Sequence, residues 1–118
     1  MYRINNNDFK ILVKYREFMN DIDNLLENIP RKDMYYKDKL RSVLDNLLKY
    51  IFRSSYEINK EKIENNLVII KSNIAMIDYM LDRLHNKKYI SDKSLYKIGN
   101  SLIEINKMVT EWLNNKIW

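Results

Sequence analysis

Apolar residues recur along this chain at alternating steps of four and three positions, a spacing that places them on one face of an α-helix. The first such series is Ile11, Tyr15, Phe18, Ile22, Leu25 and Ile29. Pro30 disfavours the α conformation of the residue before it, so the series must stop there. The pattern therefore predicts a first helix over residues 8–28, with Asp8 as its N-cap.

Three further stretches after Pro30 keep the same spacing. Their apolar positions begin with Tyr36, Leu40 and Val43, with Ile63, Leu67 and Ile70, and with Leu95, Ile98 and Leu102. We expect helices at about residues 34–55, 60–85 and 92–116, the last one capped by Ser91. Gly99 lies inside this last helix at a cost of about 1 kcal/mol relative to alanine, which suggests that a neighbouring backbone approaches closely there.

One glycine and one proline among 118 residues leave too few turn residues for a β-sandwich or a barrel. Four helices with short connections instead predict an all-α fold, a single antiparallel up-down-up-down four-helix bundle over residues 1–118. Apolar residues outside the main stripes of the first and last helices are Leu12, Met19, Leu26, Met108, Leu113 and Ile117. This surplus of apolar surface favours an oligomer.

The composition restricts the available chemistry. There is no cysteine, and His85 is the single histidine, so thiol catalysis, disulfides and a histidine-rich metal site are excluded. Asp78 and Asp82 stand four residues apart and could hold a lone metal ion, although a solvated acidic face is the simpler interpretation. We expect no catalytic residues, no metal and no cofactor, and we rank a metal-dependent enzyme as the least favoured alternative.

The N-terminal residues Met1 to Asp8 are polar and lack the apolar region of a signal peptide. No uninterrupted apolar run reaches the roughly 20 residues that a membrane-spanning helix requires. We therefore expect a cytoplasmic protein that has no membrane partner.

The net charge of +5 is unevenly distributed. Residues 31–53 carry seven basic and three acidic side chains, a net charge of +4, and residues 86–118 carry six and three, a net charge of +3. Clustered positive charge attracts polyanions, and contacts to phosphates give affinity independent of base sequence. The candidate nucleic-acid-binding residues are Arg31, Lys32, Lys37, Lys39, Arg41, Lys49 and Arg53, with Lys93, Lys97 and Lys107 extending the surface.

Tyrosines alternate with these basic residues along the second predicted helix. Stacking of bases beside cations is one interpretation, and it would suit single-stranded nucleic acid. For Tyr36 and Tyr50 we favour core packing with the hydroxyls at the rim. Both interpretations stay open for Tyr35 and Tyr56.

The junction Ile29-Pro30-Arg31-Lys32 is similar to the junction of helices 1 and 2 in Avd, the accessory variability determinant of diversity-generating retroelements. Other segments resemble the same family in the same order over residues 9–113. They are Ile74 to Ile77 with Leu81 and Leu84, Ile90-Ser91 followed by Tyr96, and Leu102 to Ile105 followed by Lys107, Met108 and Trp112.

The resemblance implies a small basic four-helix bundle that assembles as a barrel-like homopentamer. It also implies a non-catalytic accessory protein that binds the retroelement's reverse transcriptase and its template RNA, or an RNA/DNA hybrid, during mutagenic cDNA synthesis. The chain departs from the family at Asn106 and Thr110, where glycines are frequent, and at Asp78 and Asp82, where arginines are common. The alternative hypothesis is a protein–protein interaction scaffold that does not bind nucleic acid.

Overall fold

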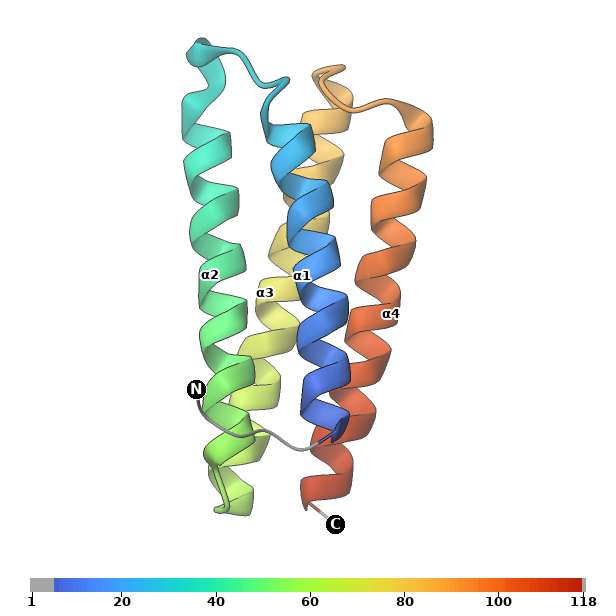
Figure 1. The fold of residues 1–118 in the computed structure, drawn as a ribbon. Helices are drawn as coiled ribbons and strands as arrows, with labels where there is room; N and C mark the ends of the chain where they lie inside the picture. Colours follow the sequence, from blue (N-terminus) through green and yellow to red (C-terminus); the bar gives the residue numbers. More distant parts are fainter. Residues whose placement is uncertain (1–5, 118) are drawn as a thin grey trace.

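The structure is a computed structural model that describes residues 6–117, with the side chains of residues 10–117. Over this range the chain forms four α-helices and no strand. The elements are α1 (Asn6–Leu26), a short 3-10 helix η1 (Arg31–Asp33), α2 (Met34–Tyr56), α3 (Lys60–Asn86) and α4 (Asp92–Ile117). Successive helices run in opposite directions (Figure 1), which confirms the predicted all-α four-helix bundle.

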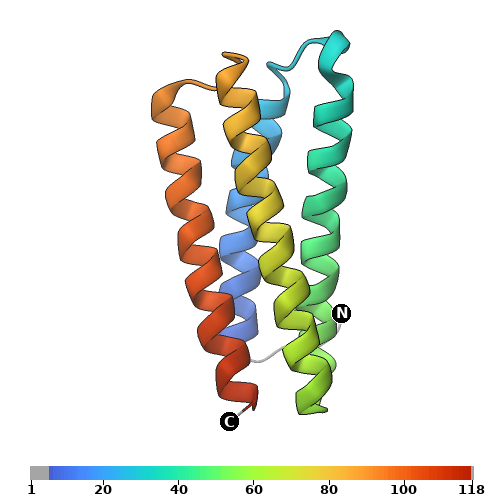
Figure 2. The ribbon, with the colours of Figure 1, turned by 180° about the vertical axis from the view of Figure 1, so that it is seen from behind.

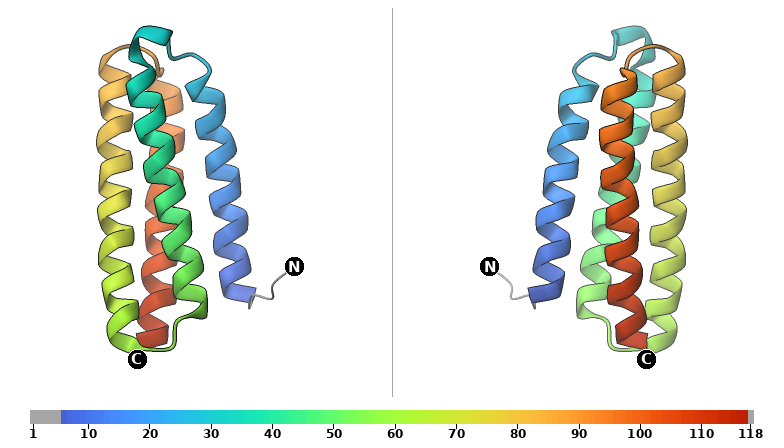
Figure 3. Two further views of the ribbon diagram at one scale, coloured as in Figure 1. Left: turned by 90° about the vertical axis from the view of Figure 1, so that its left-hand side faces the viewer. Right: turned by 90° about the vertical axis from the view of Figure 1, so that its right-hand side faces the viewer.

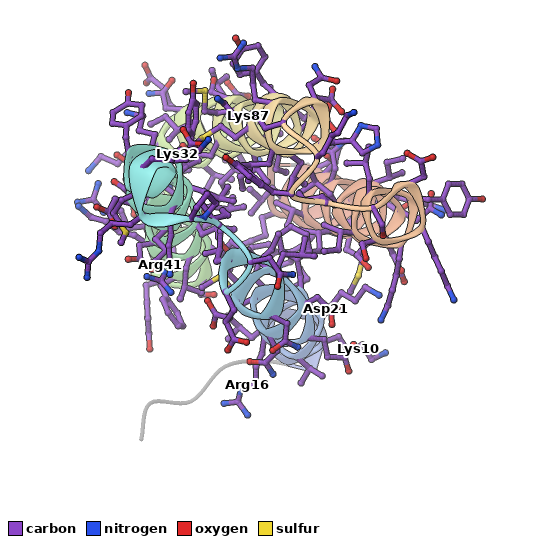
Figure 4. All side chains as sticks on the ribbon, turned by 90° about the horizontal axis from the view of Figure 1, so that it is seen from above. Lys10, Arg16, Asp21, Lys32, Arg41 and Lys87 are labelled. Carbon is purple, nitrogen blue, oxygen red and sulfur yellow. The ribbon has the colours of Figure 1, made fainter. Side chains whose placement is uncertain are left out.

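Each helix has defined neighbours in an elongated molecule of 44 × 26 × 22 Å. The helix α3 packs closely against α2 on one side and against α4 on the other, as the view from behind shows (Figure 2). The helix α1 packs more closely against α4 than against α2, and its N-terminal end diverges from α2 (Figure 3). Seen from above, α2 and α4 stand at opposite corners of the bundle (Figure 4).

The four apolar stripes meet in one core. Ile22, Leu47, Ile77 and Val109, one from each helix, are completely buried there. Tyr15 is also buried, and its hydroxyl donates a hydrogen bond to the backbone carbonyl of Leu44. Burial raises the pKa of Tyr15 above its usual value because a phenolate would lose its hydration, and the charge of Asp45 adds to this effect.

The predicted surplus of apolar surface is largely absent. Leu26 and Leu113 are fully buried inside this one chain, because the helices are close enough for the stripes to widen at their edges. The other four residues are partly buried and pack against the same core: Leu12, Met19, Met108 and Ile117. These six side chains therefore do not require a second subunit to cover them.

The helix boundaries agree with the sequence pattern for α2, α3 and α4, but they differ for α1. This helix begins at Asn6, so the prediction of Asp8 as N-cap is wrong. It ends at Leu26, because the backbone tightens into hydrogen bonds from Asn28 to Leu25 and from Ile29 to Leu26 before the proline. Ser91 does cap α4, since its Oγ accepts a hydrogen bond from the Ser94 backbone amide at 3.1 Å.

The prediction of a close backbone approach at Gly99 is also wrong. A Cβ built on this residue meets no atom within 4 Å outside its own stretch of helix. The glycine therefore contributes only the flexibility of its backbone, which favours the unfolded chain.

We expect the substitution Gly99→Ala to raise the free energy of unfolding by about 1 kcal/mol, because alanine restricts the unfolded chain and fits the helix. Urea denaturation measures this change. The control Lys107→Ala, at an exposed position of the same helix, should alter stability by less than about 0.5 kcal/mol. A destabilised Gly99→Ala protein would contradict the open surroundings of this residue.

One polar cluster joins the two connections at the same end of the bundle. The Tyr89 hydroxyl, next to the α3–α4 turn, donates a hydrogen bond to Oδ2 of Asp33 in η1. The Nζ atom of Lys87 lies 3.6 Å from Oδ1 of the same carboxylate. The hydrogen bond from Tyr89 and, to a lesser extent, the charges of Lys87 and Lys32 lower the pKa of Asp33 below its usual value.

This lowered pKa has a consequence for stability in acid. Because the pKa of Asp33 is lower in the folded than in the unfolded chain, its contribution is present above the unfolded value and disappears as the pH falls through the folded value. We expect the substitution Asp33→Asn to lower stability near neutral pH and to reduce the loss of stability between about pH 5 and pH 3. Urea denaturation at several pH values measures both, with the exposed Asp38→Asn as control. Parallel pH curves for Asp33→Asn and the unaltered protein would exclude this role.

Candidate nucleic-acid interface

The outer groove between α2 and α3, called the α2–α3 face below, is lined by polar side chains from both helices. At the end near η1, Nη2 of Arg83 donates a hydrogen bond to the Tyr36 hydroxyl at 2.9 Å. The same guanidinium lies 5.8 Å from the centre of the Tyr36 ring, and Nζ of Lys87 lies 5.2 Å from it. Tyr36 on α2 therefore contacts two cations, Arg83 from α3 and Lys87 from the turn after α3.

The middle of the α2–α3 face is a groove of about 450 Å³. It is lined by Lys39, Ser42, Val43, Asp45, Asn46 and Lys49 from α2 and by Asn73 from α3. Only Val43 is apolar among these residues, so the groove presents hydrogen-bonding groups and charge.

The far end of the α2–α3 face is a second groove of about 380 Å³. It is lined by Tyr50, Arg53, Glu57, Lys62, Asn65, Asn66 and Ile69. The Arg53 guanidinium lies 5.0 Å from the centre of the Tyr50 ring, and Nη1 donates to its hydroxyl at 3.4 Å. The Nζ atom of Lys62 lies 3.9 Å from Oε1 of Glu57. Arg53 thus rests on an aromatic ring, while Lys62 is close to a carboxylate.

The α2–α3 face is positively charged along its whole length. Its cations are Lys39, Lys49, Arg53, Lys62, Arg83 and Lys87, and its carboxylates are Asp33, Asp45 and Glu57. Six positive and three negative charges give a net charge of +3. From Tyr36 to Glu57 the face extends for about 30 Å along α2, at the usual rise of an α-helix. A surface of this charge and length can follow a phosphate backbone.

Three of the predicted binding residues lie on the α2–α3 face: Lys39, Lys49 and Arg53. All three are exposed, and none forms an ion pair with another residue in the described part of the chain. Their charges are therefore available to a ligand, as the sequence interpretation requires.

The other predicted residues near Pro30 are dispersed. Arg31 and Lys32 are exposed on η1, at one end of the bundle. Lys37 is half-buried. Arg41 is exposed, but it lies on the side of α2 near α1, whereas Lys32 and Lys87 lie on the side near α3 (Figure 4).

Lys93, Lys97 and Lys107 lie on α4, at the corner of the bundle opposite α2. Lys97 also lies 4.0 Å from Oδ1 of Asp21 on α1. The sequence analysis expected these three lysines to extend the surface of α2. Within one chain they lie on a different face of the bundle. The pattern of one helix gives the direction of its own faces, but it does not give the order of helices around the bundle.

Sequence reasoning missed the contribution of α3, above all Arg83, Lys62 and Asn73. A second series on α3 and its C-cap residue follows the same alternation of four and three: Lys62, Asn66, Ile69, Asn73, Met76, Met80, Arg83 and Lys87. It runs beside the apolar stripe on the side that faces α2. The acidic residues on other faces of α3 concealed it when charge was summed over the whole segment.

Tyr36 and Tyr50 confirm the interpretation that favoured core packing. Both are half-buried against the core, and their hydroxyls meet Arg83 and Arg53 at the surface. Tyr35 is 69% exposed, and its ring meets that of Tyr36 edge-on, with centres 5.6 Å apart. Base stacking by Tyr35 or Tyr56 stays a prediction.

Other polar groups have local structural roles. Nε2 of His85 lies 2.6 Å from Oδ1 of Asp92, which connects the end of α3 to the start of α4. Asp78 and Asp82 are exposed, and the described residues contain no group of three or more carboxylates and histidines that could hold a metal ion. No helix between residues 6 and 117 is both long and apolar enough to cross a membrane.

Comparison of the chain with models of known protein families and with curated proteins finds no match.

Proposed function

We propose that this protein is a non-catalytic accessory protein of a diversity-generating retroelement. It would bind template RNA and the reverse transcriptase in the cytoplasm and support mutagenic cDNA synthesis. The observation that carries the nucleic-acid part of the proposal is the α2–α3 face, with six cations against three carboxylates over about 30 Å. The reverse transcriptase and the homopentamer come from the resemblance to the Avd family.

The arrangement of the cations fits a polyanion better than a small ligand. Lys39, Lys49 and Arg53 lie along one helix, with ten residues between the first two and four between the last two, and Arg83 and Lys87 extend the row at one end. Phosphates spaced along a strand can meet such a row one after another, and each contact releases counterions. Tyr36 and Tyr50 hold two arginines in place, which reduces the side-chain entropy lost on binding.

Exposed apolar side chains support an assembly, although they are not the ones the sequence predicted. Ile58 in the α2–α3 connection is 92% exposed, Val68 on α3 is 65% exposed and Ile103 on α4 is 68% exposed. These side chains are also the observation that favours the second candidate function, a protein–protein scaffold. Binding to RNA separates the two candidates.

We expect single-stranded RNA to bind this protein with a strong dependence on salt concentration. The double variant Lys49→Gln/Arg53→Gln should bind more weakly and should flatten the slope of log affinity against log salt by about 1.4, because each of the two lost phosphate contacts removes roughly 0.7. Fluorescence anisotropy of a labelled oligonucleotide between about 50 and 300 mM salt measures this slope.

The matched control is Lys93→Gln/Lys107→Gln, which removes the same charge from α4 on the opposite corner of the bundle. We expect this control to keep most of the slope. Equal losses in the two double variants would show a general charge effect and would exclude the α2–α3 face as the interface. A complete lack of RNA binding at low salt would leave the scaffold as the better candidate.

The proposed pentamer has a mass of about 72 kDa, five times the 14.5 kDa of one chain. Sedimentation equilibrium should give this mass, and the substitution Ile103→Asp should shift the protein to smaller species if α4 lies in the interface. Lys107→Ala, on the same helix, serves as the control for a general effect on α4. A monomer at all concentrations would contradict the assembly.

A further inference from the structure

The middle groove of the α2–α3 face contains a buried polar group that the fold does not use. Nδ2 of Asn73 is buried and has no hydrogen-bond partner among the described residues. A buried amide without a partner costs roughly 1–3 kcal/mol. An aliphatic side chain of the same size would avoid that cost, so a role in the fold alone does not account for this asparagine.

The surroundings of Asn73 indicate what could satisfy it. Across the groove lie Ser42, Asp45 and Asn46, which offer a hydroxyl, a carboxylate and an amide. An amide turned by half a rotation about its last bond exchanges its oxygen and nitrogen without changing its shape. Because Asn73 lines the groove, its amide could present either the carbonyl oxygen or the N–H donors to a ligand there.

This set of groups is suited to a nucleobase rather than to a phosphate. A phosphate accepts hydrogen bonds and is repelled by a carboxylate, so Asp45 is unfavourable in a groove that serves phosphates only. The edge of an unpaired base presents donors and acceptors together, and a carboxylate can accept from the amino group of cytosine. Amides such as Asn46 and Asn73 can both donate to and accept from a base edge.

The positions of the two lysines complete the site. Lys39 and Lys49 line the same groove and are ten residues apart on α2, which corresponds to about 15 Å along the helix. This separation leaves room for a nucleotide between two phosphate contacts. The lysines therefore lie where the backbone on either side of an inserted base would pass.

We propose that the groove around Asn73 is a base-binding pocket for single-stranded nucleic acid, selective for unpaired bases that carry an amino group, cytosine above all, over uracil. The inference rests on the proposed function, because it assigns the ligand class of the same face. In a duplex the Watson–Crick edge of a base is occupied by its partner, so the pocket discriminates against double strands.

The experiment compares labelled oligo(C), oligo(U) and an RNA duplex by fluorescence anisotropy at one salt concentration. The unaltered protein should bind oligo(C) about tenfold more tightly than oligo(U), the ratio expected from one good base contact. The duplex should bind more weakly than oligo(C).

Two variants test the residues. Asp45→Ala removes both the negative charge and the hydrogen-bond acceptor, so it separates the two interpretations. If the groove binds phosphates only, the removal of a negative charge strengthens the binding of every oligonucleotide. If Asp45 accepts from a base, the variant loses the preference for oligo(C) over oligo(U). Asn73→Leu should also lose this preference while remaining folded, with a melting temperature at or above that of the unaltered protein, because it removes the unsatisfied amide.

The outcomes separate the inference from the proposed function. Binding of all RNAs without preference, unchanged in Asn73→Leu and strengthened in Asp45→Ala, overturns the pocket but retains the phosphate-binding face. A preference for oligo(C) that survives in both variants places base recognition elsewhere and also overturns the pocket. The absence of any RNA binding overturns both proposals together.

Discussion

The close packing of α2 against α3 is the constraint on which the proposed interface depends. Each of these helices buries one apolar stripe, and the residues beside the two stripes are thereby brought together in one outer groove. Arg83 is 47 residues from Tyr36 in sequence, yet it donates a hydrogen bond to the Tyr36 hydroxyl. The burial of apolar surface thus determines which charges act together, although the charges contribute little to the fold themselves.

The fold was predictable from the sequence because each helix carries its own signal. The 4-3 spacing, the proline and the capping serine Ser91 are local features, and the helices they predict are present in the structure. The predictions for Gly99 and Asp8 were wrong for different reasons. The role of Gly99 depends on what surrounds it in space, and its surroundings are open. Asp8 is not an N-cap because the helix begins two residues earlier, at Asn6.

The candidate site was only half predictable. The positive charge of α2 is visible in its composition, and Lys39, Lys49 and Arg53 are exposed as expected. The partner helix was missed because Arg83 belongs to a segment whose acidic residues lie on other faces, so its total charge hides its pattern. The order of helices around the bundle is a tertiary property, and for this reason the lysines of α4 were wrongly joined to those of α2.

The groove around Asn73 differs in kind from the rest of the α2–α3 face. A surface that only attracts phosphates gains affinity from every added cation and loses affinity from every carboxylate. The middle of this face nevertheless contains Asp45 and the unsatisfied amide of Asn73, with a cation at either end. Asp45 lowers the affinity for a bare polyanion, and the unsatisfied amide of Asn73 lowers the stability of the fold. Hydrogen bonding to an unpaired base would use the carboxylate of Asp45 and the amides that line the groove, so base recognition explains the composition of the groove better than charge attraction alone.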